Sequence, residues 1–302
     1  MKINTLNKSL YLILSLSLFF DLYFNIDSAG SGGFIIDFKS TWPIVENPLG
    51  YKAVNDMKFP LHYYIAGGIY NIVNDKEILR IIYCLISLPI PYLFYVCLKL
   101  KYPKIDINNL FLFSLIIFLL PSVRSAAVWP NTQITAIIFF LVSLFFFLKW
   151  ETKKEFNVIN KEILLTIFFM SLTVYTRQLY AMIFAYFVLI FFLNLSRTVF
   201  LKTVLLIFCF AVPGIILVVV WPRILQATFE FKLYNSLLVN ASIISFYLLP
   251  FFTILYFFEK KLLSFNQFKF TLFLIAFLVL LCALFFDYNY LMGGGYFIKL
   301  SK

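Results

Sequence analysis

Long apolar runs separated by short polar segments fill most of the chain. Each run holds roughly 20 residues, the length that an α-helix needs to cross the hydrocarbon core of a bilayer. The runs predict an all-α polytopic transmembrane helical bundle, a single membrane domain over residues 1–302, with about nine spans. The spans are expected near residues 9–25, 78–98, 107–122, 132–149, 162–177, 179–195, 203–221, 238–258 and 270–286.

The composition agrees with this pattern. Hydrophobic residues make up 63% of the 302 and charged residues 13%, and the mean hydropathy is +0.93. A soluble domain carries about 25% charged residues, so these values exclude a water-soluble globular fold and indicate a lipid bilayer as the surrounding medium. The net charge is +11, but the Lys and Arg residues lie between the apolar runs and form no basic face. That distribution argues against a nucleic-acid partner.

The Lys and Arg residues also predict the orientation. They are more numerous on the side of the membrane that carries Lys2 and Lys8, so the N-terminus is expected on the cytoplasmic side. The membrane is a bacterial inner membrane or that of the endoplasmic reticulum. No small-residue cleavage site follows the first apolar run, so this run is predicted to be an uncleaved span. An odd number of spans leaves the C-terminus outside, and the prediction allows for a C-terminally truncated chain.

One external segment is much longer than the others, residues 25–77 between the first two spans. Within it, "NDMKFPLHYYIAGG" places Asp56, Lys58 and His62 beside Pro60, a residue that fits the first turn of a helix. The spacing predicts a short amphipathic helix at the membrane surface. The alternative is an ordinary interfacial loop in which Lys58 extends its ammonium group to water.

Asp37 lies earlier in the same segment, in "SGGFIIDFKSTWP", among apolar residues and shortly before Trp42. A carboxylate in such surroundings binds a proton more tightly and can serve as a general base. The alternative is a solvated loop aspartate.

Two arginines lie at predicted outer ends of spans: Arg124 in "LLPSVRSAAVWPNTQ" and Arg177, followed by Gln178, in "TVYTRQLYAM". Arginine at a membrane boundary often only reaches for water. Apolar runs adjoin Arg177 on both sides, however, and a charge in that position usually faces a cavity or a partner. A phosphate group fits the forked donors of a guanidinium.

The sequence predicts no metal site built from Cys or His. The chain has one His, and its four Cys residues lie inside apolar runs without paired spacing. One or two carboxylates in the long external segment leave a divalent cation, Mg²⁺ or Mn²⁺, open.

Three stretches together resemble the GT-C superfamily of membrane glycosyltransferases, most closely its dolichyl-phosphate-glucose-dependent α-1,2-glucosyltransferases. They are "IIDFKSTWP", "VNDMKFPLHYYI" and "TVYTRQLYAMIF", and "EILRIIYCLISL" is a looser match. The similarity covers roughly the first two thirds of the chain and lies in order and topology. Where that family has an acidic pair, this chain has Asp37 followed by Phe38.

The resemblance implies transfer of a hexose from a polyprenyl-phosphate (dolichyl-phosphate) sugar to a lipid-linked or glycan acceptor on the non-cytoplasmic face. Asp37 is then the expected general base, with Asp56 as the alternative base. Arg177, with Lys58 or Arg124, is expected to bind the phosphate.

Unless it is the base, Asp56 is expected to orient the acceptor together with His62, and Trp42 and Gln178 are expected to bind substrate. Two other function classes remain open: a transporter or flippase for lipid-linked saccharides, and a non-catalytic membrane subunit. A transporter is expected to show paired halves and charges deep within its spans.

Overall fold

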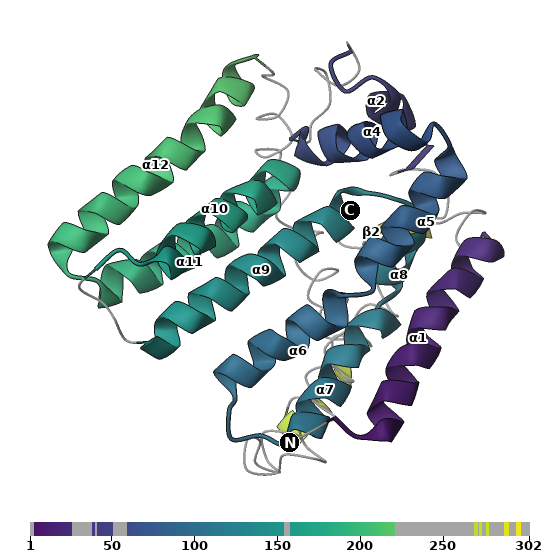
Figure 1. Ribbon diagram of the computed structural model, residues 1–302, viewed down its shortest axis with the longest axis horizontal. Coiled ribbons are helices and arrows are strands. Elements are labelled where there is room, and N and C mark those ends of the chain that lie inside the picture. The colour runs from purple at the N-terminus through teal and green to yellow at the C-terminus, as the bar shows by residue number, and fades with distance from the viewer. Residues whose placement is uncertain are drawn as a thin grey trace.

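The computed structural model describes residues 3–25, 38–39, 41–50, 59–153 and 158–220, with short pieces at 269–270, 272–273, 276–277, 287–289 and 294–296. The described chain is helical apart from two three-residue strands (Figure 1). The helices are α1 (Thr5–Tyr23), α2 (Trp42–Glu46), α4 (Leu61–Val73), α5 (Lys76–Ser87), α6 (Ile90–Lys101), α7 (Ile107–Leu115), η2 (Ile116–Leu119), α8 (Pro121–Val128), α9 (Thr132–Lys153), α10 (Lys161–Thr176), η3 (Gln178–Tyr180), α11 (Ala181–Asn194) and α12 (Arg197–Val220). The strands β1 (Asp287–Asn289) and β2 (Gly294–Tyr296) pair antiparallel.

Among the described residues, three helical stretches are long and apolar enough to cross a membrane: Lys76–Lys101, Thr132–Lys153 and Arg197–Leu217. A fourth forms if Ile107–Leu119 and Ser122–Val128, bent by 67° between them, count as one. These helices are typical of a membrane protein. The prediction of nine spans stays a prediction. The described helices at the spans predicted near 9–25, 162–177 and 179–195 are not among these stretches. The span near 238–258 lies outside the described residues, and the one near 270–286 almost entirely does.

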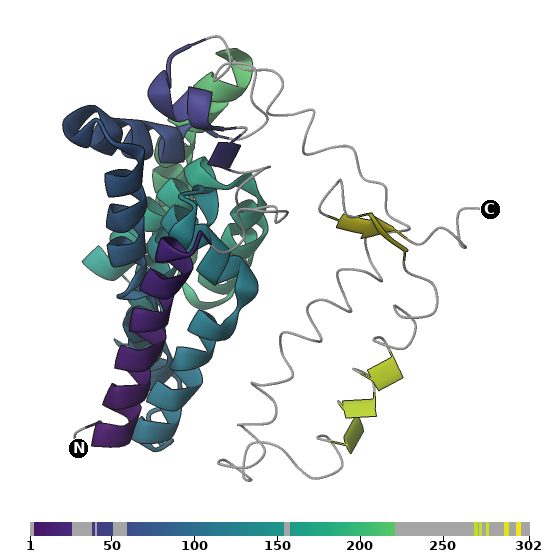
Figure 2. The same ribbon diagram turned by 90° about the vertical axis from the view of Figure 1, so that its right-hand side faces the viewer.

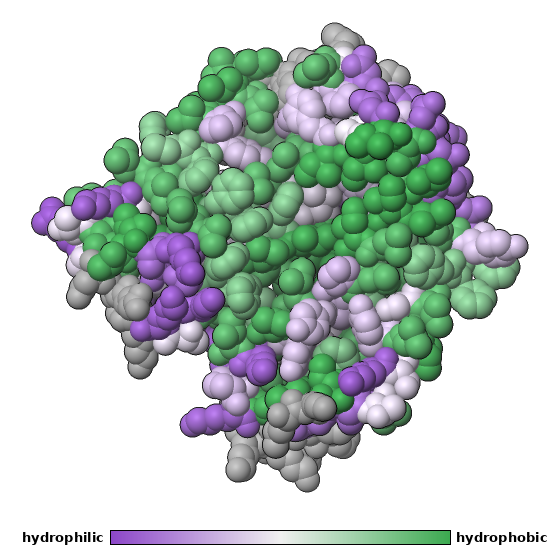
Figure 3. Space-filling model, in the orientation of Figure 1, coloured by the Kyte–Doolittle hydropathy of each residue, from purple (hydrophilic) through white to green (hydrophobic). Residues whose placement is uncertain are grey.

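The surface supports the same environment. Large apolar side chains stay exposed along whole helices, for example Leu205 (64% exposed) and Phe208 (59%) on α12 and Phe192 (60%) on α11. In Figure 3 the hydrophobic colour runs across the visible face, and the hydrophilic residues gather at its margins. A monomeric soluble protein rarely exposes contiguous apolar surface of this kind, whereas lipid solvates it.

Side-chain caps determine where several helices begin. Asp75 accepts hydrogen bonds from the backbone N–H groups of Glu77 and Ile78 at the start of α5. Asp106 does the same for α7, and Asn160 for α10. Each cap satisfies backbone donors that have no partner within the helix, a need that is greatest where little water is available.

Proline residues break the span of α5 and α6. Pro89 and Pro91 lack the N–H that would continue the ladder, and the two helices meet at Leu88–Pro89. The Leu88 N–H donates to the Leu85 carbonyl, and the Tyr11 hydroxyl of α1 donates to the Leu88 carbonyl at 2.9 Å. The Leu88 backbone groups at the break therefore have hydrogen-bond partners, one of them on a neighbouring helix, as in other membrane bundles.

The α9–α10 pair forms the centre of the bundle and has the most extensive contact between two described elements. Ser143 of α9 donates to the backbone carbonyl of Thr166 on α10 at 2.8 Å. Small side chains at this crossing let the helices approach closely. Apolar cores lie on either side: one joins α1, α2, α4, α5 and α8 to α9, and the other joins α10, α11 and α12 to α9.

Helices α2 and α4 lie across one end of the bundle, away from the N-terminus (Figures 1 and 2). Helix α4 occupies the range where the sequence predicts a short helix, and its position at a membrane surface stays a prediction. It ends at Asn74, whose left-handed conformation (φ 49°, ψ 29°) lets the chain turn directly into α5. The packing of α4 on α2 depends on Gly67. A Cβ at this position would lie 2.6 Å from the Val45 carbonyl oxygen and 2.9 Å from Cγ of Pro48.

The two adjacent glycines of α4 should respond to alanine in opposite ways. Gly67→Ala is expected to lower the free energy of unfolding by about 1–3 kcal/mol, because the methyl group would overlap the Val45 carbonyl oxygen and the Pro48 ring, neither of which can easily move aside. Gly68→Ala is expected to raise it by about 0.5–1 kcal/mol, since no atom lies within 4 Å of its Cβ position. Thermal unfolding in detergent, followed by tryptophan fluorescence, measures both. Equal effects of the two substitutions would contradict the packing of α4 on α2.

Candidate functional site

A charged pocket of about 420 Å³ lies where the end of α1, the α2 helix, the start of α5 and the α8–α9 turn meet. Its lining comprises three cations, one carboxylate, three aromatic residues and one amide: Lys39, Lys76, Arg80, Glu77, Phe38, Trp42, Trp129 and Asn25. Cations outnumber carboxylates three to one in this lining. The pocket is therefore suited to an anion.

Trp42, predicted to bind substrate, forms one wall of this pocket. It opens α2, and its indole N–H donates to Oε1 of Glu46 at 2.5 Å. The ring meets Tyr70 of α4 edge-on at 4.9 Å between centroids. The ammonium group of Lys76 lies 4.3 Å from the Trp42 ring centroid and 4.0 Å from the Glu46 carboxylate. The indole face therefore helps to hold the Lys76 cation beside the pocket.

Arg80 is the most enclosed charge of the pocket. Its side chain is 2% exposed, its Nη1 donates to Oε2 of Glu77 at 2.6 Å, and its Nε donates to the Val128 carbonyl at 3.1 Å. The guanidinium carbon lies 3.6 Å from the centroid of the Trp129 ring. Its Nη2 is buried and has no hydrogen-bond partner within the described part of the chain. A buried donor without a partner destabilises the fold by about 1–3 kcal/mol.

Asp37 lies outside the described residues, as do Asp56 and Lys58. The two residues that follow Asp37, Phe38 and Lys39, line the charged pocket, and the Phe38 ring packs 5.2 Å from that of Trp129. The roles predicted for Asp37, Asp56 and Lys58 stay predictions.

His62 does not line the charged pocket. It is 1% exposed, and its Nδ1 lies 2.9 Å from the Thr135 hydroxyl of α9 and 3.4 Å from the Tyr83 hydroxyl of α5. These contacts join α4 to α5 and α9. His62 thus stabilises the bundle in this structure, and its predicted contact with an acceptor stays a prediction.

Arg124 has its guanidinium inside the bundle, paired with another helix. Nη2 lies 2.5 Å from the Asp21 carboxylate, and the Arg124 and Asp21 side chains are 21% and 14% exposed. Nη1 also donates to the Ser17 hydroxyl at 2.9 Å, and Nη2 to the Ser17 carbonyl at 3.2 Å. These bonds fasten α8 to α1 and occupy the donors that a phosphate would need.

Arg177 caps the C-terminus of α10, where its backbone N–H donates to the Thr173 carbonyl at 2.8 Å, and Gln178 begins η3. Both side chains are half-buried. The Arg177 guanidinium makes no ion pair or hydrogen bond with another described residue. Tyr175 and Ala181, on either side of it, line an apolar cavity of about 410 Å³. Phe59, which follows Lys58, lines the same cavity, and its ring lies 5.9 Å from that of Tyr175.

The structure therefore divides the predicted residues among three places. Trp42 lies in the charged pocket, Arg177 and Gln178 lie at the end of α10, and His62 and Arg124 lie in the packed bundle. Sequence reasoning missed Lys76, Glu77 and Arg80 as pocket residues. The available signal was "EILRIIY", in which an arginine sits inside an apolar run with a glutamate three residues before it.

No group of three or more His, Cys, Asp and Glu side chains could hold a metal ion among the residues that the structure describes. The question of a divalent cation stays open. Comparison of the chain with protein-family models, with curated proteins and with solved structures gives no significant match.

The Arg124–Asp21 pair should prove structural. Arg124→Gln and Asp21→Asn are each expected to lower the free energy of unfolding by about 3–5 kcal/mol, because each leaves a charge without its partner in a place poor in water. The double variant should lose less than the sum of the two losses. Arg197→Gln, at an exposed position where α12 begins, is the matched control.

Unfolding in detergent measures these effects. If Arg124→Gln keeps its stability but no longer binds a lipid phosphate, Arg124 is a substrate-binding residue and the structural role is wrong.

Proposed function

We propose that the chain is a membrane glycosyltransferase that moves a hexose from a polyprenyl-phosphate sugar to a lipid-linked or glycan acceptor on the non-cytoplasmic face. The observation that carries this proposal is the charged pocket at the end of an apolar bundle. It gathers three cations, and one of them, Lys39, lies two residues after Asp37 in the chain. A donor of this kind keeps its lipid in the membrane and brings its phosphate to that boundary.

The cations of the pocket are held in place before any ligand arrives. Trp129 and Glu77 fix the Arg80 guanidinium, and Trp42 and Glu46 hold the Lys76 ammonium. Such preorganisation lowers the free energy needed to order side chains on binding. It also directs the donors at the place where charge develops in the reaction.

The reaction is a single displacement. The oxygen of the acceptor hydroxyl attacks the anomeric carbon, and the bond from that carbon to the phosphate oxygen breaks. The phosphate departs on its lipid, and the hydroxyl proton passes to a carboxylate, Asp37 in this proposal or Asp56 as the alternative. The phosphate gains negative charge as it leaves, and Arg80 and Lys76 stabilise that charge.

Arg177 and Gln178 extend the proposal to the end of α10. Tyr175 and Ala181, which lie before and after Arg177 in the chain, line an apolar cavity. We assign Arg177 to phosphate binding alongside the charged pocket, and Trp42 to substrate contact within that pocket.

Transfer of radiolabelled hexose from polyprenyl-phosphate donors by the purified full chain tests the proposal. Asp37→Asn is expected to lower the rate by about 10²–10⁴-fold, the usual contribution of a general base. Lys76→Gln should lower it without unfolding the protein, because the Lys76 side chain is 48% exposed. Arg80→Gln should lower it further. Glu151→Gln, at the far end of α9 in an exposed ion pair with Lys101, is the control and should leave the rate unchanged.

Transfer that survives in Asp37→Asn would move the base to Asp56. If no donor and acceptor pair gives transfer with the folded wild type, the enzyme proposal is wrong and the flippase or subunit alternatives take its place.

A further inference from the structure

The two ends of the bundle carry very different charge. The basic end, as we call it, holds the starts of α1, α7, α10 and α12 and the last turns of α6 and α9. Among the described residues up to Val220, it bears nine cations and three carboxylates, whereas the opposite end bears five cations and four carboxylates. The nine cations are Lys8, Lys99, Lys101, Lys104, Lys149, Lys153, Lys161, Arg197 and Lys202.

Contacts between helix ends bring these cations to one surface. The start of α1 is hydrogen-bonded to the start of α7. The last turn of α6 is joined to that of α9 by the ion pair of Lys101 with Glu151 at 2.9 Å, and α9 is joined to the start of α10 by the pair of Lys153 with Glu162 at 2.8 Å. Val199, in the first turn of α12, packs in the same apolar core as the ends of α9 and α10. The basic end is therefore one continuous surface.

The three carboxylates of the basic end already have partners. Two form the ion pairs just described, and Asp106 accepts hydrogen bonds from the backbone N–H groups that begin α7. At the opposite end, by contrast, three of the five described cations are paired with carboxylates. Seven cations of the basic end have no carboxylate partner among the described residues: Lys8, Lys99, Lys104, Lys149, Lys161, Arg197 and Lys202. Their charge is left for a negative partner outside the chain.

The unpaired cations adjoin apolar side chains that only lipid solvates. On α12, Lys202 lies one turn before Leu205, which is 64% exposed, and exposed apolar residues continue along this helix to Val219. On α1, Lys8 lies one turn before Leu12, which is 58% exposed. A soluble polyanion would cover the ammonium groups and leave these side chains in water. A phospholipid covers both, with its headgroup at the cation and its acyl chains along the helix.

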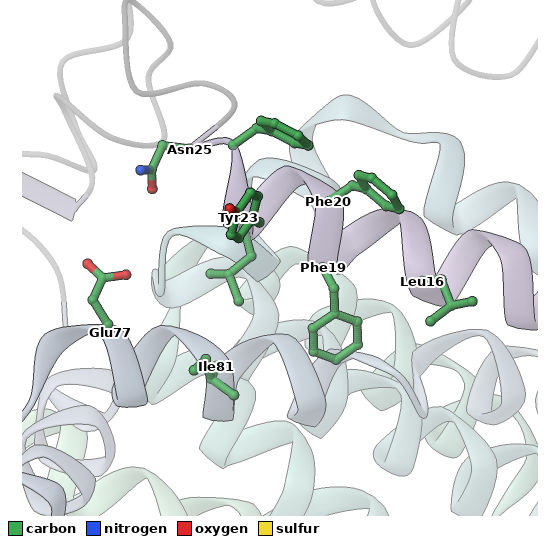
Figure 4. A pocket seen from close by; sticks show the side chains of 9 residues that line it. Leu16, Phe19, Phe20, Tyr23, Asn25, Glu77 and Ile81 are labelled. Carbon is green, nitrogen blue, oxygen red and sulfur yellow. The ribbon is translucent and has the colours of Figure 1, made fainter.

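The space between α1 and α5, here called the α1–α5 cleft, shows the opposite combination. It is an apolar hollow of about 690 Å³ (Figure 4). Its lining contains no cation, and its one charged residue is Glu77, which Figure 4 shows at the same end as the Asn25 amide. Such a lining gives no preference for a negative headgroup. We therefore expect selection of negative lipid at the basic end and not in this cleft.

We infer that the basic end binds anionic phospholipids of the leaflet in which it lies, diacyl phosphodiesters with a net negative headgroup. These lipids surround and orient the bundle and are not consumed, so the inference does not rest on the proposed function. A cation near an anionic membrane surface strengthens attraction by about fivefold in affinity. Because the unpaired cations gather at one end, an anionic leaflet favours one orientation of the bundle, with the charged pocket at the other leaflet.

The measurement is the lipid preference of the purified full chain in neutral detergent. Native mass spectrometry gives the association constants of phosphatidylglycerol and phosphatidylcholine with the same acyl chains, and the preference is their ratio. The wild type should prefer phosphatidylglycerol by at least about fivefold. Two double variants, Lys99→Gln with Lys104→Gln and Lys161→Gln with Lys202→Gln, should each lower the ratio by about 5- to 25-fold relative to a wild type that carries all seven unpaired cations.

The matched control is Lys101→Gln with Glu151→Gln. It also changes two residues at these helix ends, but it removes an ion pair and leaves the net charge unchanged. The ratio should stay within about twofold of the wild type. Without added lipid, all three double variants should unfold in detergent at the wild-type temperature, because the substituted side chains lie at the surface. A loss of preference is then a loss of binding and not of folding.

A wild-type ratio near one would overturn the inference, as would equal ratios in the wild type and the two charge-removing variants. A ratio that falls in Lys39→Gln, at the opposite end, and not in those variants would place the negative lipid at the charged pocket and overturn it as well. Polyglutamate that displaces phosphatidylglycerol from the wild type at equal charge concentration would make an acidic protein the partner. Hexose transfer is not measured, so each outcome is independent of the glycosyltransferase proposal.

Discussion

A charge inside a bundle surrounded by lipid must find its partner within the protein, and this constraint governs how the first half of the chain is arranged. Asp21 on α1 pairs with Arg124 on α8, and Arg80 on α5 donates to the carbonyl of Val128 at the end of α8. Both contacts converge on α8. They place α1 and α5 on the same short helix, and the space left between those two helices is the α1–α5 cleft.

At the end of the bundle, two cations of the charged pocket also find their partners within the protein. There α2 and α4 lie across the helix ends (Figures 1 and 2), and Trp42 and Trp129 provide faces against which cations rest. Aromatic faces stabilise a cation without neutralising it. Glu77 and Glu46 also lie against Arg80 and Lys76, so the rings add support to cations that carboxylates already hold, and Lys39 is the cation of the lining without an ion pair among the described residues.

The apolar runs predict the helices well, because the length of such a run can be counted directly from consecutive residues. The span expected at 132–149 appears as α9 (Thr132–Lys153), and the described part of that expected at 203–221 lies within α12. The breaks were less well predicted. The span at 78–98 is interrupted at Leu88–Pro89, and the span at 107–122 ends in a bend of 67° before α8. Proline in a membrane helix is compatible with either a kink or a break, and the neighbouring helices determine which occurs.

The site was harder to predict than the helices. The partners of a charged side chain depend on which helices pack together, and the local sequence does not show this. Arg124 is at the predicted helix end, yet nothing in "LLPSVRSAAV" indicates that Asp21, more than 100 residues earlier in the chain, takes up its charge. The surroundings of Arg80 were equally hidden in the sequence. It reads as one cation near the start of a span, and only the folded chain shows that Glu77, Trp129 and the Val128 carbonyl leave one of its nitrogens without a partner.

One further contact links the candidate residues to the last described long helix. Pro213 lies inside α12. Beside it the Tyr175 hydroxyl accepts a hydrogen bond from the Gly214 N–H at 3.1 Å and donates one to the Phe210 carbonyl. These groups are four residues apart and would otherwise bond directly, so a side chain of α10 completes the ladder of α12. Arg177 follows Tyr175 by two residues. The turn that carries Arg177 is therefore anchored, through Tyr175, to a helix more than thirty residues further along the chain.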